Sequence, residues 1–269
     1  VFDTLPVPAQ DITLSIDIDL QEYGTKLLAN KRGGILAIEP NSGEILMSVS
    51  TPTYAPNLLV GRERSENFKV LKQDTLNRYL FDRSLQGQYP PGSPFKVLNA
   101  LIALEEGVIT PKATFNCYSG HFYARGQFME CKCKPGTVNN LDRGIHNSCN
   151  TYFSNVYRRI IDKDNNAAEG INTWQRHLSS FGLGNYLGYD HPVGQSGYVP
   201  NANFYNLWYP NQRWRGATTV SNAIGQGEIL MTPIQLANVA ATIANRGFFY
   251  TPHFVKGIQG DFITPGFKA

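Results

Sequence analysis

The order of apolar and polar positions near the start of the chain predicts a short strand followed by a helix. Positions 12, 14 and 16 are apolar and alternate with polar residues, as in a half-buried strand. The apolar residues after them recur with helical spacing, and one helix face would carry Leu20, Tyr23, Leu27 and Leu28. The period of the pattern therefore changes from two residues to about 3.6 within this segment.

Two apolar segments that follow are predicted to pair as a β-hairpin. They cover residues 35–39 and 44–49. The residues between them are Pro40, Asn41, Ser42 and Gly43. These residue types favour tight turns, because proline fixes φ and glycine tolerates positive φ. We therefore expect an antiparallel pair of strands over residues 33–50.

The most apolar helix is predicted over residues 93–106. Its apolar side chains cover nearly the whole circumference of the helix, so we expect a central, buried helix that ends at Gly107. A second helix is predicted from about residue 150 to residue 162. Residues 108–140 and 185–216 show neither period, and we expect them to be irregular. Segments of this length and kind usually line a site or contact a partner.

A helix near the C-terminal end carries its own start and stop signals. Thr232 would be the N-cap, with Pro233 at the first helical position. Gln235 would complete a capping box with Thr232. Gly247 would end the helix.

The composition fits one large globular domain over residues 1–269. The sequence is 42% hydrophobic and 17% charged, so it can bury a sizeable core. The formal net charge is only +3 and the basic residues are scattered, so we expect no nucleic-acid partner. No apolar run approaches the roughly 20 residues of a membrane-spanning helix. The chain begins without methionine, and we expect a piece of a longer protein, with residues 1–13 as a candidate linker from a preceding domain.

Ser93 and Lys96 form the first candidate catalytic pair. Ser93 begins the apolar helix, where unpaired N–H groups and the helix dipole favour developing negative charge. Lys96 lies one turn further along, and burial would lower its pKa, so that a neutral amine would take the serine proton. The alternative is an N-cap serine beside a lysine whose ammonium reaches solvent. Residues 90–92, Pro-Pro-Gly, force a sharp entry into this helix and favour the catalytic hypothesis.

Two short motifs carry a resemblance to a known family. Residues 89–107 read YPPGSPFKVLNALIALEEG and hold an S-x-x-K pattern at Ser93 and Lys96. Residues 144–153 read GIHNSCNTYF and hold an S-x-N pattern from Ser148 to Asn150, followed by an aromatic pair. Both motifs, at this separation, resemble those of the penicillin-binding proteins, the serine D,D-transpeptidases of peptidoglycan synthesis.

Other segments extend the resemblance over nearly the whole chain. They are residues 11–21, 33–57 and 223–247. Residues 214–227, WRGATTVSNAIGQG, are most similar to the elongation-specific class B type, penicillin-binding protein 2. The division-specific type is the nearest alternative. The resemblance implies an α+β fold, the penicillin-binding transpeptidase (β-lactamase-like) fold, with an antiparallel sheet, flanking helices and a helical subdomain.

The resemblance also implies roles for individual residues. Ser93 would attack the carbonyl of a D-Ala-D-Ala stem peptide, and Lys96 would accept its proton. Ser148 would hydrogen-bond Lys96 and relay a proton to the leaving amine, while Asn150 would orient Lys96 and bind a substrate amide. Taken alone, the serine and asparagine would be caps at a turn between two helices. The segment Gly225-Gln226-Gly227 is expected to bind substrate.

The third motif of the family, K-[ST]-G, is missing from this sequence. Lys256-Gly257 lacks the hydroxyl residue, and Lys268 is followed only by Ala269. In the family that strand holds the substrate carboxylate and supplies one oxyanion N–H. We therefore expect the motif beyond Ala269, and expect residues 1–269 alone, which would lack the C-terminal strands, to be acylated poorly.

The four cysteines allow more than one structural role. Cys117, Cys131 and Cys133 lie between the two motifs, and Cys117 could form a disulfide with either of the other two. Alternatively these three, with His146 or His121 as the fourth ligand, would hold a structural Zn²⁺. Some relatives carry a metal in this region. The fourth cysteine, Cys149, is expected to pack inward as a small hydrophobic residue.

The resemblance implies partners and a location as well. The substrates would be peptidoglycan stem peptides, with β-lactam antibiotics as suicide substrates and other wall-synthesis proteins as partners. No cofactor would be required for catalysis. The location would be the periplasmic face of the inner membrane, reached through an N-terminal anchor outside this sequence. Alternatives are a non-catalytic β-lactam sensor or a scaffold for wall synthesis; a β-lactamase is disfavoured, because such enzymes are usually compact and lack these long insertions.

Overall fold

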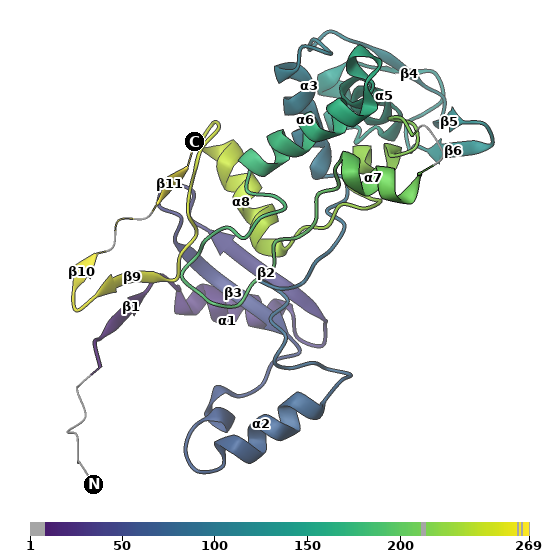
Figure 1. The fold of residues 1–269 in the computed structure, drawn as a ribbon. Coiled ribbons are helices and arrows are strands. Elements are labelled where there is room, and N and C mark those ends of the chain that lie inside the picture. Colours follow the sequence, from purple (N-terminus) through teal and green to yellow (C-terminus); the bar gives the residue numbers. More distant parts are fainter. Residues whose placement is uncertain (1–8, 211–213, 263, 265, 269) are drawn as a thin grey trace. The chain divides into compact units, whose positions relative to one another are not determined.

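Two units, each assembled from distant parts of the sequence, make up the chain (Figure 1). The computed structural model describes residues 9–210, 214–262, 264 and 266–268. The sheet unit comprises Val1–Gly87, Tyr186–Gln195 and Thr232–Ala269. The helical unit comprises Gln88–Asn185 and Ser196–Met231.

The predicted hairpin is present in the sheet unit as β2 (Gly33–Ile38) and β3 (Ile45–Thr51). The strands pair antiparallel, starting with Gly33 opposite Thr51. Every second residue of β3 is buried, beginning at Ile45, because alternate side chains of a strand point to opposite faces. The buried side of β3 faces the core of this unit.

Helix α1 (Ile18–Leu27) packs on β3 through Gly24. A Cβ at Gly24 would lie 2.3 Å from Met47 Sδ, so the helix approaches the strand more closely than any other residue would allow. On the same side, Gln21 donates to Ser48 O at 2.7 Å and accepts from Ser48 N at 2.9 Å. The predicted apolar face was wrong in part, because this glycine and glutamine face the strand instead. Two residues of that face are exposed, Tyr23 and Leu27.

A three-stranded antiparallel sheet forms from both ends of the chain. Its strand order is β1 (Ile12–Leu14), β9 (Val255–Ile258) and β10 (Asp261–Phe262). Residues 12 and 13, which lie in the candidate linker, therefore belong to a sheet. Residues 1–8 of that linker lie outside the described residues.

The capped helix of the sheet unit is α8 (Pro233–Ala244). Its predicted capping box is confirmed, since Thr232 accepts from Gln235 N while the Gln235 side chain accepts from Thr232 N at 3.0 Å. The remaining elements of this unit are η1 (Pro56–Leu59), α2 (Arg64–Gln73), β8 (Phe249–Tyr250) and β11 (Phe267–Lys268).

Helices α3 (Phe95–Glu105) and α5 (Asn150–Ile161) hold the centre of the helical unit. Trp174 of α6 (Ala167–Ser180) packs edge-on against Phe95, with ring centroids 5.9 Å apart. Both side chains are almost wholly buried. The predicted central helix is therefore confirmed.

The segments that we predicted as irregular contain regular structure. Residues 108–140 form two antiparallel strand pairs, β4 (Phe115–Cys117) with β7 (Thr137–Asn139) and, between them in the sequence, β5 (Gly120–Ala124) with β6 (Gln127–Glu130). Strands of three to five residues are too short to show a clear alternating period. The other segment includes α7 (Ala202–Trp208), and the last elements of the unit are α4 (Leu141–His146), η2 (Lys163–Asn165) and η3 (Val220–Ile224).

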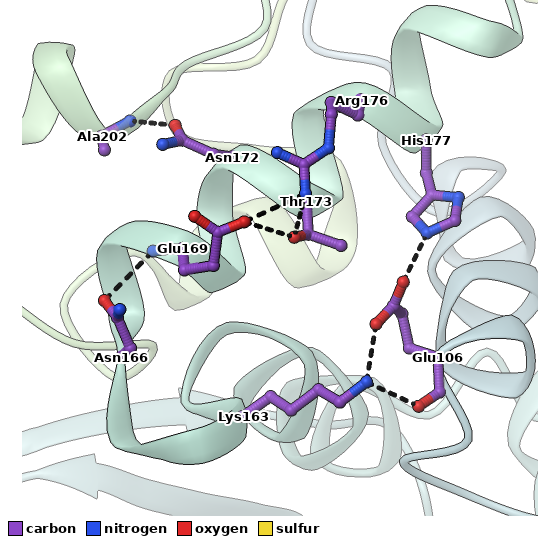
Figure 2. Close-up of polar contacts among 9 residues, drawn as sticks. All are labelled: Glu106, Lys163, Asn166, Glu169, Asn172, Thr173, Arg176, His177 and Ala202. Carbon is purple, nitrogen blue, oxygen red and sulfur yellow. Dashed lines mark hydrogen bonds and ion pairs between the residues drawn. The ribbon is translucent and has the colours of Figure 1, made fainter.

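Charged contacts fasten the C-terminal end of α3 to its neighbours (Figure 2). Glu106 Oε1 lies 2.8 Å from His177 Nε2 on α6, and Glu106 Oε2 lies 2.8 Å from Lys163 Nζ. Hydrogen bonds from His177 and Lys163 lower the pKa of the Glu106 carboxyl, because both favour its ionised form.

No helix in the described part of the chain is long and apolar enough to cross a membrane.

Candidate active site

Ser93 is exposed on the tight turn that leads into α3. Gly92 has a φ of +69°, and its carbonyl accepts from Phe95 N at 3.0 Å. Lys96 N donates to Ser93 O at 3.0 Å, so the first turn is tightened and α3 begins at Phe95 rather than at Ser93. The glycine tolerates the positive φ that the chain needs here. The turn therefore presents the Ser93 hydroxyl outside the helix.

Lys96, one turn beyond Ser93, ends among four oxygen atoms. Its side chain is buried, with the residue only 3% exposed. Nζ lies 3.2 Å from Ser93 Oγ, 2.9 Å from Ser148 Oγ and 2.6 Å from Asn150 Oδ1. It also lies 2.7 Å from Ser148 O. The structure thus brings together all four residues that the two motifs nominated.

Burial lowers the pKa of Lys96 below its ordinary value. The nearby thiols of Cys131, Cys149 and Cys133 oppose this effect, because negative charge on them favours the ammonium form. A lysine whose ammonium is poorly solvated can lose a proton and serve as a base. Its distance from Ser93 Oγ is within the range at which proton transfer takes place.

Ser148 and Asn150 reach Lys96 from the connection between α4 and α5. Ser148 has a φ of +47°, and its N–H donates to Ile145 O at 2.9 Å. A positive φ is unusual for a residue with a Cβ and is often found at functional sites. Asn150 begins α5 and its Nδ2 donates to Glu130 O at 2.9 Å, which leaves Oδ1 directed at Lys96.

Cys149, between these two residues, is turned the other way and joins the other three cysteines. The ligand atoms of Cys117, Cys131, Cys133 and Cys149 all lie within 4.8 Å of one another. All four cysteines are buried, and none is in a disulfide, so the alternative disulfide of Cys117 is not formed. His146, the predicted fourth ligand, lies outside this group of four cysteines. His146 is exposed at the end of α4, whereas Cys149 is the buried N-cap of α5.

The thiols have strongly different proton affinities. Burial would raise the pKa of Cys131, but hydrogen bonds from Cys133 N, Thr151 N and the neighbouring thiols lower it to about 6. Burial raises the pKa of Cys149, whose Sγ accepts from Tyr152 N at 3.3 Å. The cluster therefore favours one thiolate among protonated neighbours. Sequence analysis missed Cys149 as a member, since its place inside the S-x-N motif suggested packing alone.

The segment Gly225-Gln226-Gly227 divides into a buried part and an exposed part. Gly225 is buried and its carbonyl accepts from Gly92 N at 2.8 Å, directly before Ser93. Gln226 and Gly227 are exposed. Substrate contact through these two residues stays a prediction, whereas Gly225 contacts the turn that carries Ser93.

The chain resembles proteins of one family in both sequence and fold. The family described as the penicillin binding protein transpeptidase domain matches residues 33–267. The peptidoglycan D,D-transpeptidase MrdA of Acinetobacter baumannii is 34% identical over 259 residues, covering 95% of this chain and 37% of that protein. This chain therefore spans a little over a third of the length of that relative.

Two solved structures show the same fold. Pseudomonas aeruginosa PBP2, in complex with WCK 5153, has a TM-score of 0.83 and 32% identity, covering 98% of this chain and 59% of that one. Helicobacter pylori PBP2, in a complex with MreC, has a TM-score of 0.79 and 31% identity, covering 95% of this chain and 45% of that one. These findings confirm the α+β prediction and the resemblance to penicillin-binding protein 2. Because the family match covers most of the sequence and these relatives agree with it in fold, the chain belongs to the penicillin-binding protein transpeptidase family.

Proposed function

We propose that the protein is a serine D,D-transpeptidase that cross-links peptidoglycan stem peptides during cell elongation and shape maintenance. One observation carries the proposal: Lys96 Nζ lies within hydrogen-bond distance of Ser93 Oγ, Ser148 Oγ and Asn150 Oδ1. These distances support roles for Ser93 as nucleophile, Lys96 as base and Ser148 as proton relay. The names of its relatives support this reaction.

In the acylation step, Ser93 Oγ attacks the carbonyl carbon of the penultimate D-alanine, and its proton passes to the Lys96 amine. The C–N bond to the terminal D-alanine then breaks, and Ser148 relays a proton to the leaving amine. In the second step, the amine of another stem peptide attacks the ester carbonyl and loses a proton to Lys96. Ser93 Oγ leaves and regains its proton, so the enzyme returns to its starting state.

The experiment is mass spectrometry of the full-length protein after exposure to a β-lactam. Attack by Ser93 opens the lactam ring, so we expect an adduct of the full antibiotic mass on the peptide with Ser93. The adduct should be lost in Ser93→Ala and much reduced in Lys96→Ala, whereas Ser65→Ala, at an exposed position on α2, should keep it. An adduct that persists in Ser93→Ala would overturn the proposal. Residues 1–269 alone should react more slowly, because K-[ST]-G is missing from them.

Partners and location follow from the same assignment. One similar structure is a complex between PBP2 and MreC of Helicobacter pylori, which supports other wall-synthesis proteins as partners. We place the protein at the periplasmic face of the inner membrane, where its substrate is cross-linked. We expect the protein to co-purify with wall-synthesis proteins from solubilised membranes. The protein should be absent from the soluble fraction.

The four cysteines would hold a structural zinc ion beside the active site. Tetrahedral Zn²⁺ with Zn–S bonds of about 2.3 Å separates its sulfur ligands by about 3.8 Å. Cys131 Sγ and Cys149 Sγ lie 3.7 Å apart, and the whole set lies within 4.8 Å, so the donor set fits the ion. Zinc would fasten the two strand pairs of residues 108–140 to the start of α5.

Elemental analysis of the purified protein tests the zinc site. We expect about one zinc per chain, as a closed four-ligand site requires. Cys149→Ser should lose the metal, whereas His146→Ala, the matched control, should retain it. Zinc that is lost in His146→Ala and kept in Cys149→Ser would restore the earlier hypothesis. No metal, with four free thiols in the denatured protein, would refute both the zinc site and a disulfide.

A further inference from the structure

Asn99 is a wholly buried polar side chain within the otherwise apolar helix α3. It lies at 0% exposure, and the catalytic steps above make no use of it. Asparagine is a poor helix former, and a buried amide without partners costs free energy. Its presence one turn beyond Lys96 therefore needs a physical reason.

The amide of Asn99 is fully engaged with two other parts of the helical unit. Its Oδ1 accepts from Trp174 Nε1 at 2.8 Å. Its Nδ2 donates to Ala223 O at 3.0 Å and Asn222 O at 3.3 Å, both on η3. These bonds join the catalytic helix to α6 on one side and to η3 on the other. One side chain of α3 thus donates to both carbonyls.

Gly225, the residue that follows η3, contacts the turn that leads into α3. Gly225 has a φ of +67°, and its carbonyl accepts from Gly92 N at 2.8 Å. A Cβ at Gly225 would lie 2.2 Å from Gly92 O and 2.7 Å from Phe95 Cβ, so only glycine permits this approach. Residues 222–225, here called the clamp, thus contact α3 at Asn99 and the turn before α3 at Gly92.

The clamp is itself held by buried side chains. Asn222 is 0% exposed, and its Nδ2 donates to Tyr205 OH at 2.8 Å and Tyr157 OH at 3.3 Å. Tyr205 in turn donates to Glu228 Oε2 at 2.9 Å. The clamp therefore has fixed partners on α5 and α7. Because its position is fixed, it can in turn fix the position of the turn that carries Ser93.

We propose that Asn99 is a positioning residue, which through the clamp fixes Ser93 Oγ relative to Lys96 Nζ. The inference rests on the proposed function for its effect on acylation. Loss of the amide removes one donor from each of the two clamp carbonyls, of which Asn222 O also accepts from Gly225 N at 3.2 Å. The clamp then shifts together with Gly92. Ser93 and Lys96 would lose their alignment, although neither residue is changed.

The first test measures β-lactam acylation of the full-length protein with Asn99→Ala, at a temperature where circular dichroism shows it folded. We expect the limiting acylation rate to fall about 10- to 100-fold, since small misplacements have effects of this order. The half-saturating antibiotic concentration should change little. Asn99→Asp, which retains an acceptor for Trp174 but repels the clamp carbonyls, should resemble Asn99→Ala.

Asn238→Ala is the matched control, because Asn238 is equally buried but lies on α8 in the sheet unit. It should lower the melting temperature and leave the acylation rate of the folded protein near that of the unchanged protein. Equal acylation by Asn99→Ala and the unchanged protein would overturn the proposal. A fall in Asn238→Ala as large as in Asn99→Ala would show general loosening and would equally overturn it.

The second test does not depend on the reaction with antibiotics. In Ser93→Cys, the Lys96 ammonium should lower the pKa of the introduced thiol, which the pH dependence of its alkylation reports. The native cysteines are buried and should react more slowly. Adding Asn99→Ala should return that pKa toward about 8.5. An unchanged thiol pKa would refute the clamp, whereas failure of the unchanged protein to be acylated would refute only the proposed function.

Discussion

Replacement of Gly225 by alanine tests whether the position of Ser93 depends on the contact between Gly225 and Gly92. The added Cβ would lie 2.2 Å from Gly92 O, and real Cβ contacts essentially never fall below 3.0 Å. The Gly92 carbonyl must therefore retreat by about 0.8 Å, and Ser93 is the next residue. A misplacement of about 1 Å can reduce a reaction rate about 100-fold. We expect a loss of acylation close to that size in Gly225→Ala.

The stability cost can be worked out from the same contacts. Alanine at a φ of +67° costs roughly 1–2 kcal/mol, and overpacking adds roughly 1–3 kcal/mol. Gly107→Ala is the matched control, because Gly107 has a φ of +66° but nothing within 4 Å of its added Cβ. It should carry only the first cost, roughly 1–2 kcal/mol, and keep its acylation rate.

The assay follows covalent labelling by a fluorescent penicillin over time, beside urea unfolding of each variant. If Gly225→Ala and Gly107→Ala were acylated at the same rate while folded, the contact between Gly225 and Gly92 would have no part in catalysis. If both lost equal stability, the close approach at Gly225 would be absent in solution.

Three further predictions concern the stability of each unit. Hydrogen bonds from His177 and Lys163 lower the pKa of Glu106, so their stabilising contribution is complete above the unfolded pKa of about 4.3 and is lost as pH falls through the folded value. Acid unfolding of Glu106→Gln, followed by fluorescence, should therefore depend less on pH in this range. Gly24→Ala should lower the urea midpoint by overpacking Met47, at a cost of about 1–3 kcal/mol. Thr232→Ala should cost about 1 kcal/mol in the same assay by removing the cap of α8.

Sequence patterns were most informative where the chemistry is local. Ser93 and Lys96 are one turn apart, so their approach follows from helix geometry alone. The capping box at Thr232 is equally local and is confirmed. Ser148 and Asn150 lie more than fifty residues away, and their convergence on Lys96 was expected only from the resemblance to a family.

Other features depend on distant contacts that no local pattern carries. Asn99 is one polar residue in an apolar run, and nothing in its sequence neighbourhood indicates a bond to Trp174 or to residues 222–223. Cys149 was expected to be buried, which is correct, but its thiol neighbours come from strand pairs whose strands are too short for periodicity. His146 was favoured for its side-chain type, yet the end of α4 leaves it exposed.

The alternation of directions at Ser148, Cys149 and Asn150 couples the thiol cluster to the surroundings of Lys96. The outer two side chains reach Lys96, while the middle one belongs to the thiol cluster. A displacement of the Cys149 backbone would be passed to both neighbours, because planar peptide units join the three residues. We therefore expect a reagent that alkylates Cys149 to shift Ser148 and Asn150 relative to Lys96 without any change at Ser93 itself.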